Sequence, residues 1–179
     1  MRIFLIGMPG SGKTRIGRAL AKRLQMPFFD LDHEIEKEGK KSIPEIFLIE
    51  GENYFRIVEK DVLRKVIDRE KQCVLATGGG APCFFDNMAY MNQNGITIFL
   101  NVPLKDLYER LVKRGTNTRP LLKDMTSGEL KIELQQKFND RIPYYRSANQ
   151  EITTSYGVVE KRVAEIVDLL SGLKENSET

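Results

Sequence analysis

Short apolar runs alternate with longer amphipathic segments along the chain, and this alternation predicts strands followed by helices. Compact apolar runs are typical of buried strands in a parallel sheet, where both faces are covered. The predicted strands are residues 3–6, 27–30, 73–77, 96–101 and 151–154. Helical spacing of apolar positions begins near Lys13, Glu52, Pro103, Gly128 and Val158. The order indicates βαβ units and an α/β fold in which helices cover a parallel sheet.

Two segments interrupt this alternation. Residues 32–61 carry two helical patterns between the second and third strands, and Ser42 followed by Glu45 fits a capping box. Residues 115–128 are rich in Thr, Gly and Asn, contain Arg119, and have the composition of a lid loop. We therefore expect a single domain over residues 1–179, with a core (1–31, 62–112 and 125–179), a helical substrate-binding arm (32–61) and a lid (113–124).

Composition narrows the class of protein. The chain has 179 residues, and its 28 Lys and Arg against 25 Asp and Glu give a small positive excess, which favours an anionic small molecule over nucleic acid as partner. Cys73 and Cys83 belong to no CxxC pair or histidine cluster, which argues against a disulfide framework and a zinc site. No apolar stretch is long enough to span a membrane, and the first strand leaves no room for a signal peptide. We expect a cytoplasmic protein.

The most informative stretch is GMPGSGKT, Gly7 to Thr14, which fits the pattern G-x-x-x-x-G-K-[ST] between a predicted strand and a predicted helix. Glycines allow successive backbone N–H groups to turn toward phosphate oxygens, and the helix N-terminus adds its positive end. Lys13 is expected to reach the β- and γ-phosphates, and the Thr14 hydroxyl to bind Mg²⁺. The loop residues expected to contact the nucleotide are Gly10, Ser11, Gly12, Lys13 and Thr14.

A triphosphate site alone does not identify the reaction. The chain contains no N-K-x-D or D-x-x-G stretch of a GTPase, and it is too short for most ATP-driven machines, so a kinase is favoured. Asp30 and Asp32 stand at the end of the second strand, where residues two apart in an extended chain point to the same side. We expect Asp30 near Mg²⁺ and Asp32 near the acceptor, where it can take the proton of a hydroxyl. The alternative is that either aspartate only caps the next helix.

Arginines and glycines add a second group of candidates. Arg56 lies beside Phe55 in the arm, and its two-pronged donor suits a carboxylate; the alternative is a solvated helical pair with Glu59. Glu59 is otherwise expected to hold Arg56 in place. The run TGGGAP, residues 77–82, follows the third strand and allows a ligand to approach the backbone, unless it is only a flexible turn.

Other arginines surround the expected lid. Arg110 and Arg114 lie one helical turn apart on the way into it, and Arg119 lies within it. An arginine closing over the γ-phosphate would stabilise transferring charge while the lid excludes water, although Arg114 could equally be a solvated cation at a helix end. Arg141 and Arg146 flank a predicted PYY turn.

Taken together, GMPGSGKT, DLD, GENYFR with its following E, TGGGAP and TRPLL resemble the shikimate kinase family, in the same order along essentially the whole chain. The resemblance implies a P-loop kinase of the nucleoside-monophosphate kinase type, with an α/β/α core and a five-stranded parallel sheet in the order 2-3-1-4-5. It implies transfer of the γ-phosphate of ATP to the 3-hydroxyl of shikimate, with Mg²⁺, on the route to chorismate and the aromatic amino acids.

The resemblance also implies roles for residues at matching positions. Lys13 and Arg119 would contact the transferring phosphate, Thr14 and Asp30 would organise Mg²⁺, and Asp32 would bind the acceptor hydroxyls as candidate base. The residues implied to bind the rest of shikimate are Arg56, Arg141, Gly78, Gly79 and Gly80. An adenine-contacting segment near residues 153–157 matches only loosely. ATP and shikimate would be the partners, without nucleic acid or membrane, and a monomer is expected.

Two other functions remain open on the sequence alone. A related kinase could act on gluconate or on a nucleoside monophosphate, although the FR arm with GGG disfavours the first and the potential base Asp32 disfavours the second. A protein that binds nucleotide without catalysis is disfavoured by the presence of Lys13, Thr14, Asp32 and Arg119.

Overall fold

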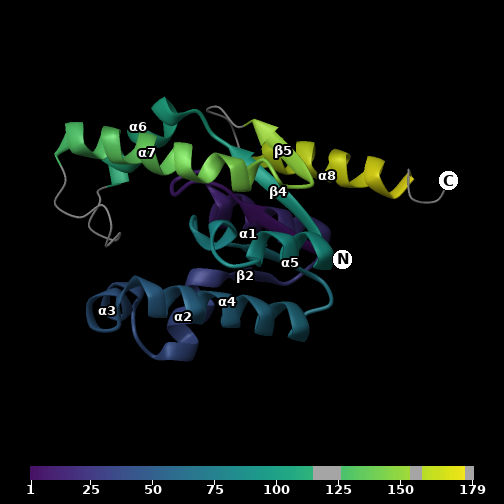
Figure 1. The fold of residues 1–179 in the computed structure, drawn as a ribbon. Coiled ribbons are helices and arrows are strands. Elements are labelled where there is room, and N and C mark those ends of the chain that lie inside the picture. The colour runs from purple at the N-terminus through teal and green to yellow at the C-terminus, as the bar shows by residue number, and fades with distance from the viewer. Residues whose placement is uncertain (115–125, 154–158, 176–179) are drawn as a thin grey trace.

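A computed structural model describes residues 1–114, 126–153 and 159–175, and the ribbon in Figure 1 shows their arrangement. One sheet in the described residues contains β1 (Arg2–Ile6), β2 (Phe28–Asp30), β3 (Cys73–Ala76), β4 (Ile96–Asn101) and β5 (Gln150–Thr153). All strand pairings are parallel, in the order β2-β3-β1-β4-β5. The predicted α/β class and strand order are therefore confirmed, and each predicted strand forms within one residue of its expected ends.

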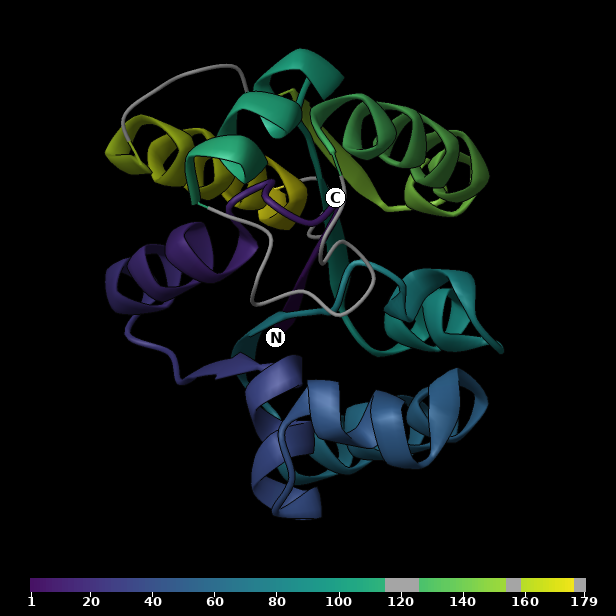
Figure 2. The ribbon, with the colours of Figure 1, turned by 90° about the vertical axis from the view of Figure 1, so that its left-hand side faces the viewer.

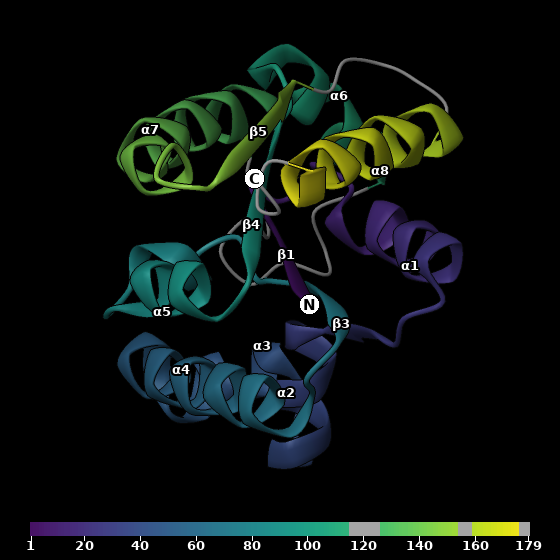
Figure 3. The ribbon, with the colours of Figure 1, turned by 90° about the vertical axis from the view of Figure 1, so that its right-hand side faces the viewer.

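Helices cover both faces of this sheet because successive side chains of each strand point to opposite sides. In β1, Ile3 and Leu5 pack with α1 (Lys13–Leu24) and α8 (Val159–Glu175), whereas Phe4 and Ile6 pack on the other side. That second face is covered by α4 (Gly51–Arg69), α5 (Asn87–Asn94), α6 (Leu104–Arg114) and α7 (Ser127–Tyr145). Figures 2 and 3 show α1 and α8 together on one side of the strands, with α4, α5 and α7 opposite.

The helical arm is built from α2 (Leu31–Gly39), α3 (Ile43–Ile49) and the start of α4. The predicted capping box forms at α3: the Glu45 backbone N–H donates to Ser42 Oγ, while the Glu45 carboxylate accepts from the Ser42 backbone N–H at 2.7 Å. The expected border between arm and core, at residues 61 and 62, falls inside α4, which is one continuous helix. The arm is thereby fixed to the core by a single rigid element.

One helix was not predicted from the sequence. The short helix α5 lies between β3 and β4, where no helix was predicted, and it is preceded by a 3₁₀ turn at Ala81–Cys83. Its sequence, NMAYMNQN, buries only two apolar side chains, Met88 and Met91, so it offers little helical periodicity.

Three further expectations bear on the chain as a whole. Both Cys73 and Cys83 carry free thiols, as predicted, and burial raises the pKa of each to about 11. No helix within the described residues has the length and apolar character needed to cross a bilayer. The predicted lid, apart from residues 113 and 114, lies outside the described residues, as does Arg119.

Candidate active site

A cavity of about 900 Å³ opens at the carboxyl ends of β1, β2 and β3, between the arm and α7. Its walls combine the glycine loop, the start of α1, the arm, the triple-glycine turn and one face of α7. The predicted site residues that line it are Gly10, Gly12, Lys13, Thr14, Asp30, Asp32, Arg56, Gly78, Gly79, Gly80 and Arg141. Residues predicted from separate stretches of sequence thus meet in one space. Ser11, also predicted, belongs to the loop but is only 1% exposed and is not among the residues that line the cavity.

The phosphate-binding loop has the backbone that its glycines allow. Gly7, Gly10 and Gly12 have φ values of 140°, 87° and 97°, a region that side chains with a Cβ rarely adopt. Gly12 caps α1 without a side chain, so the first N–H groups of that helix point toward the cavity. Lys13 is 9% exposed and its ammonium donates to the carbonyls of Gly7 and Met8 at 2.8 and 3.0 Å. The lysine charge is therefore held at the centre of the loop.

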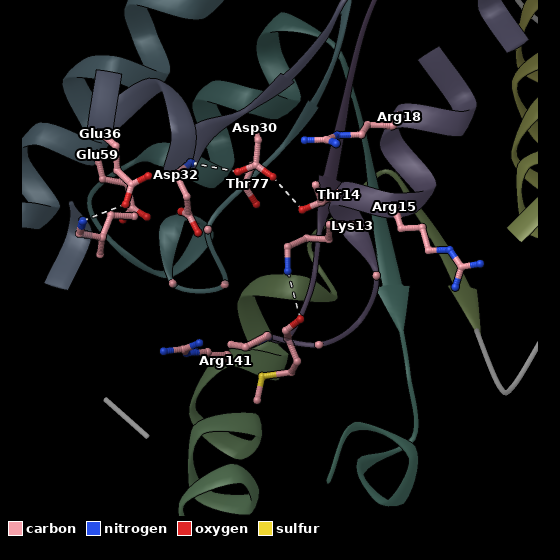
Figure 4. A pocket seen from close by; sticks show the side chains of 18 of the residues that line it. Lys13, Thr14, Arg15, Arg18, Asp30, Asp32, Glu36, Glu59, Thr77 and Arg141 are labelled. Atoms are coloured by element: carbon pink, nitrogen blue, oxygen red, sulfur yellow. Dashed lines mark hydrogen bonds between the residues drawn. The ribbon is translucent and has the colours of Figure 1, made fainter. Parts of the chain in front are cut away.

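Thr14 and Asp30 form a direct contact across the cavity floor (Figure 4). The Thr14 hydroxyl donates to Asp30 Oδ2 at 2.7 Å, while Asp30 Oδ1 accepts the Asp32 backbone N–H at 3.2 Å. Asp30 is thus the N-cap of α2, and Asp32 belongs to the first turn of that helix. The expectation that both aspartates extend from a strand is wrong, because the chain turns into a helix directly after Asp30. Both nevertheless line the cavity.

The Thr14 hydroxyl and the Asp30 carboxylate suit a magnesium ion that binds together with the nucleotide. Among the described residues, no group of three or more His, Cys, Asp or Glu side chains is arranged to hold a metal. Mg²⁺ prefers oxygen ligands and commonly keeps several waters and substrate phosphates in its shell. A hydroxyl and a carboxylate 2.7 Å apart beside the phosphate loop suit that role better than that of a resident metal centre.

Arg56 enters the cavity from the arm and is buried, with 5% of its surface exposed. Its Nε and Nη2 donate to one oxygen of Glu52 at 3.2 and 2.9 Å, and its Nη1 donates to Glu59 at 2.8 Å. The interpretation of Arg56 as a solvated surface pair is therefore wrong. Burial alone would lower the pKa of Arg56, but the two carboxylates outweigh it and raise that pKa.

Glu59 is the most deeply buried charged group in the cavity wall, with no exposed surface. Its Oε2 accepts from Arg56, whereas its Oε1 has no hydrogen-bond partner among the described residues. Burial raises the pKa of Glu59 to about 7 despite the attraction of Arg56, and the negative charge of Asp32 adds to the rise. The carboxyl is therefore able to hold a proton near neutral pH.

The backbone of the triple-glycine turn lies close to the charged side chains of Asp32, Arg56, Glu59 and Arg141. A Cβ on Gly78 would lie 2.7 Å from Glu59 Oε1 and 3.0 Å from Asp32 Oδ1. A Cβ on Gly79 would lie 3.2 Å from Arg141 Nη1, and one on Gly80 would lie 2.7 Å from both terminal nitrogens of Arg56. The three glycines therefore allow two carboxylates and two guanidinium groups to surround one turn. The interpretation as a plain flexible turn is wrong.

Tyr145, which no pattern in the sequence indicated as a site residue, binds the backbone of this turn. Its hydroxyl donates to the Gly79 carbonyl at 2.6 Å, and burial raises the pKa of the phenol, which keeps it protonated as a donor. Tyr145 is the last residue of α7, and Pro143 also lies inside that helix, so the predicted PYY turn is wrong. Arg110 lies on α6, the helix that leads toward the predicted lid, and its side chain donates to the Gly10 carbonyl at 3.3 Å.

The far end of the cavity is basic. Arg15, Arg18 and Lys22 line it from α1. Figure 4 shows Arg15 and Arg18 on the opposite side of Lys13 from Glu36 and Glu59. Their spacing along α1 is a possible signal in the sequence, but solvated cations on a helix give the same pattern.

Comparison with known proteins supports the resemblance noted in the sequence. The sequence model of the family described as "Shikimate kinase" matches residues 9–171. The shikimate kinase of Bacteroides fragilis is 47% identical over 149 residues, covering 83% of this chain and 82% of that protein. The shikimate kinase of Parabacteroides distasonis is 38% identical over 169 residues, covering 94% and 96%.

Solved structures agree with this assignment. The crystal structure of shikimate kinase from Bacteroides thetaiotaomicron superposes with a TM-score of 0.88 at 39% identity, covering 96% of this chain and 98% of that one. Shikimate kinase from Acinetobacter baumannii in complex with shikimate superposes with a TM-score of 0.89 at 36% identity, covering 97% and 94%. Because the family model spans most of the chain and these two relatives match over 82% and 96% of their own lengths, the chain belongs to the shikimate kinase family.

Proposed function

We propose that this protein transfers the γ-phosphate of ATP to the 3-hydroxyl of shikimate, giving shikimate 3-phosphate and ADP. The observation that carries the proposal is the meeting of two unlike half-sites in one cavity. Lys13 and the N-terminus of α1 suit a triphosphate, and Arg56, Arg141 and Asp32 suit a small acid that carries hydroxyls.

On the nucleotide side, the backbone N–H groups after Gly10 and Gly12 and the ammonium of Lys13 bind the phosphates. Lys13 exchanges its carbonyl partners in the loop, 2.8 and 3.0 Å away, for phosphate oxygens of higher charge. Thr14 and Asp30 hold Mg²⁺, which neutralises phosphate charge when it is bound. Arg119 is assigned the role of closing over the transferring group, and this stays a prediction because the residue lies outside the described part of the chain.

On the acceptor side, the remaining N–H donors of Arg56 suit a carboxylate. A guanidinium has five N–H donors. Three of these donors point to Glu52 and Glu59, which leaves one N–H on each terminal nitrogen. Those two donors form a fork that can bind both oxygens of one carboxylate. Arg141 adds a second positive charge from α7, near Gly79.

Asp32 then lies at the junction of the two half-sites. In Figure 4 its carboxylate lies between Glu59 on one side and Thr14 and Lys13 on the other. An alcohol must lose its proton during phosphoryl transfer, and a carboxylate positioned beside it can accept that proton. A phosphate acceptor would already be an anion, so Asp32 favours an alcohol over a nucleoside monophosphate.

The proposal is tested by an acceptor screen. We expect Mg²⁺-dependent ADP release that requires shikimate and is negligible with gluconate, AMP or CMP, measured in a coupled assay with purified protein. Stimulation by one of the other acceptors would reassign the substrate. Absence of turnover with all four would favour a nucleotide-binding protein without catalysis. The monomeric state, the absence of nucleic-acid partners and the cytoplasmic location stay predictions.

A further inference from the structure

The side chain of Phe84 lies against the guanidinium of Arg56, outside the residues that line the cavity. The Arg56 Cζ lies 4.2 Å from the centroid of the Phe84 ring, closer than its 5.0 Å to the ring of Phe55. A guanidinium prefers to stack on an aromatic face, where the ring quadrupole attracts its charge. Phe84 therefore contacts a face of the group, while Glu52 and Glu59 hold its edges.

The contact is one of a series between α4 and residues 84–90. Lys60, one turn after Arg56, has its ammonium 5.1 Å from the Phe85 ring. Arg64, one turn further, forms an ion pair with Asp86 and lies 5.0 Å from the Tyr90 ring. Residues four apart lie on one face of a helix, so one edge of α4 is docked along this segment.

The backbone conformation at Phe85 allows the rings of two consecutive residues, Phe84 and Phe85, to contact the same helix, α4. In an extended segment, successive side chains point to opposite sides. Phe85 instead has φ of 52°, which is uncommon for a residue with a large side chain. Its ring remains 57% exposed, so the turn does not serve to bury it. Of the three described contacts at Arg56, Lys60 and Arg64, only the one at Arg56 involves a residue of α4 that lines the cavity.

Phe84 also links Arg56 to the triple-glycine turn. Glu52 and Glu59 belong to α4, the same helix as Arg56, whereas Phe84 contacts the guanidinium from a different segment of the chain. Phe84 directly follows the 3₁₀ turn that begins after Gly80, and Gly80 lies against both terminal nitrogens of Arg56. The position of the Phe84 ring is therefore set by the triple-glycine turn, the same segment that lies against the terminal nitrogens of Arg56.

We propose that Phe84 is a positioning residue for the acceptor: its ring fixes the plane of the Arg56 guanidinium and so directs the fork toward the acceptor carboxylate. This inference rests on the proposed function, because it requires a carboxylate at Arg56. It predicts that the identity of residue 84 controls recognition of the acid group and leaves the nucleotide site unchanged.

The experiment compares Phe84→Leu, which keeps an apolar side chain but removes the aromatic face, with Phe84→Tyr, which keeps the face. Phe85→Leu is the matched control, because it removes the neighbouring ring from Lys60 rather than from Arg56. Each full-length variant is assayed with shikimate and with the carboxamide of shikimate, and KM for ATP and the thermal midpoint are recorded.

For Phe84→Leu we expect KM for shikimate to rise about 5-fold, with kcat and KM for ATP unchanged. The preference for the acid over the amide should fall by the same factor, and Phe84→Tyr and Phe85→Leu should resemble the wild type.

Unchanged acid preference in Phe84→Leu would overturn the inference, as would an equal loss in Phe85→Leu or equal losses with acid and amide. If the wild type itself fails to prefer the acid, the contact between Arg56 and a carboxylate is wrong, and the proposed function fails rather than the role of Phe84. Should Phe84→Leu not fold, pentafluorophenylalanine at position 84 keeps the ring shape and reverses its quadrupole. The same rise in KM is then required, and its absence overturns the inference.

Discussion

Replacing Gly80 by alanine should damage acceptor binding through a single steric conflict. The added Cβ would lie 2.7 Å from Nη1 and Nη2 of Arg56 and 2.9 Å from Cζ, whereas ordinary contacts begin at 3.4 Å. The guanidinium or the turn must therefore move by the difference between 3.4 and 2.7 Å, roughly 0.7 Å. Gly80 has φ of −88°, which alanine adopts freely, so backbone strain adds nothing.

The size of the expected effect follows from this displacement. Because misplacing a reacting group by about 1 Å can cost about 10²-fold in rate, we expect kcat/KM for shikimate to fall about 50-fold in Gly80→Ala. Binding of ATP should be unchanged, since the three atoms nearest a Cβ on Gly80 all belong to Arg56 and none to the phosphate loop. The measurement is steady-state kinetics with either substrate varied, together with ATP titration by calorimetry.

A matched control separates local from general effects of adding a methyl group. Gly172 lies in α8, and a Cβ there would meet nothing within 4 Å, so Gly172→Ala should have wild-type kinetics. Wild-type KM and kcat in Gly80→Ala would refute the assignment of Arg56 and the glycine turn to the acceptor. A loss confined to ATP binding would refute it equally.

Three further predictions concern the other charged groups. Asp32→Asn should lower kcat by at least about 10²-fold with little change in ATP affinity, because the base is lost while the shape persists; wild-type turnover in stopped-flow assays would remove Asp32 from the mechanism. The pKa of Glu59 is raised to about 7 from an ordinary value of 4.5, so the folded protein retains a proton that the unfolded chain releases. The free energy of unfolding should therefore fall as the pH rises from about 4.5 to about 7, and this part of the slope should vanish in Glu59→Gln; identical slopes in urea titrations of both proteins would contradict the burial argument. Removing Mg²⁺ with EDTA should abolish turnover, and Thr14→Val should raise the Mg²⁺ concentration needed for half-maximal rate; an unaltered Mg²⁺ requirement would exclude the Thr14 hydroxyl.

Local rules were sufficient to predict the phosphate loop and the capped start of α3. The glycine spacing around Lys13 and the pair formed by Ser42 and Glu45 specify their conformations within a few residues, so no distant contact was needed. The parallel strands were equally clear, because strands covered on both faces are apolar throughout.

The errors arose where tertiary structure overrides local pattern. Asp32 was taken to continue the extended chain after the second strand, but the chain turns into α2 directly after Asp30, whose side chain caps that helix, and the pattern FDLD does not distinguish the two conformations. The environment of Arg56 and Glu59 is completed by the triple-glycine turn and by Phe84, which come from a different part of the chain. A glutamate and an arginine three positions apart look the same in sequence whether solvent or protein surrounds them.

The arm has a consequence for how acceptor choice can change. Asp32, Arg56 and Glu59 all belong to one uninterrupted stretch, α2 to α4, inserted between two neighbouring strands. The phosphate loop is formed separately, between β1 and α1. Exchanging that stretch for one with different side chains would thus change which alcohol binds, while the ATP-binding part of the enzyme stays the same. Arg141, contributed by α7, is the contact that such a graft would have to accommodate.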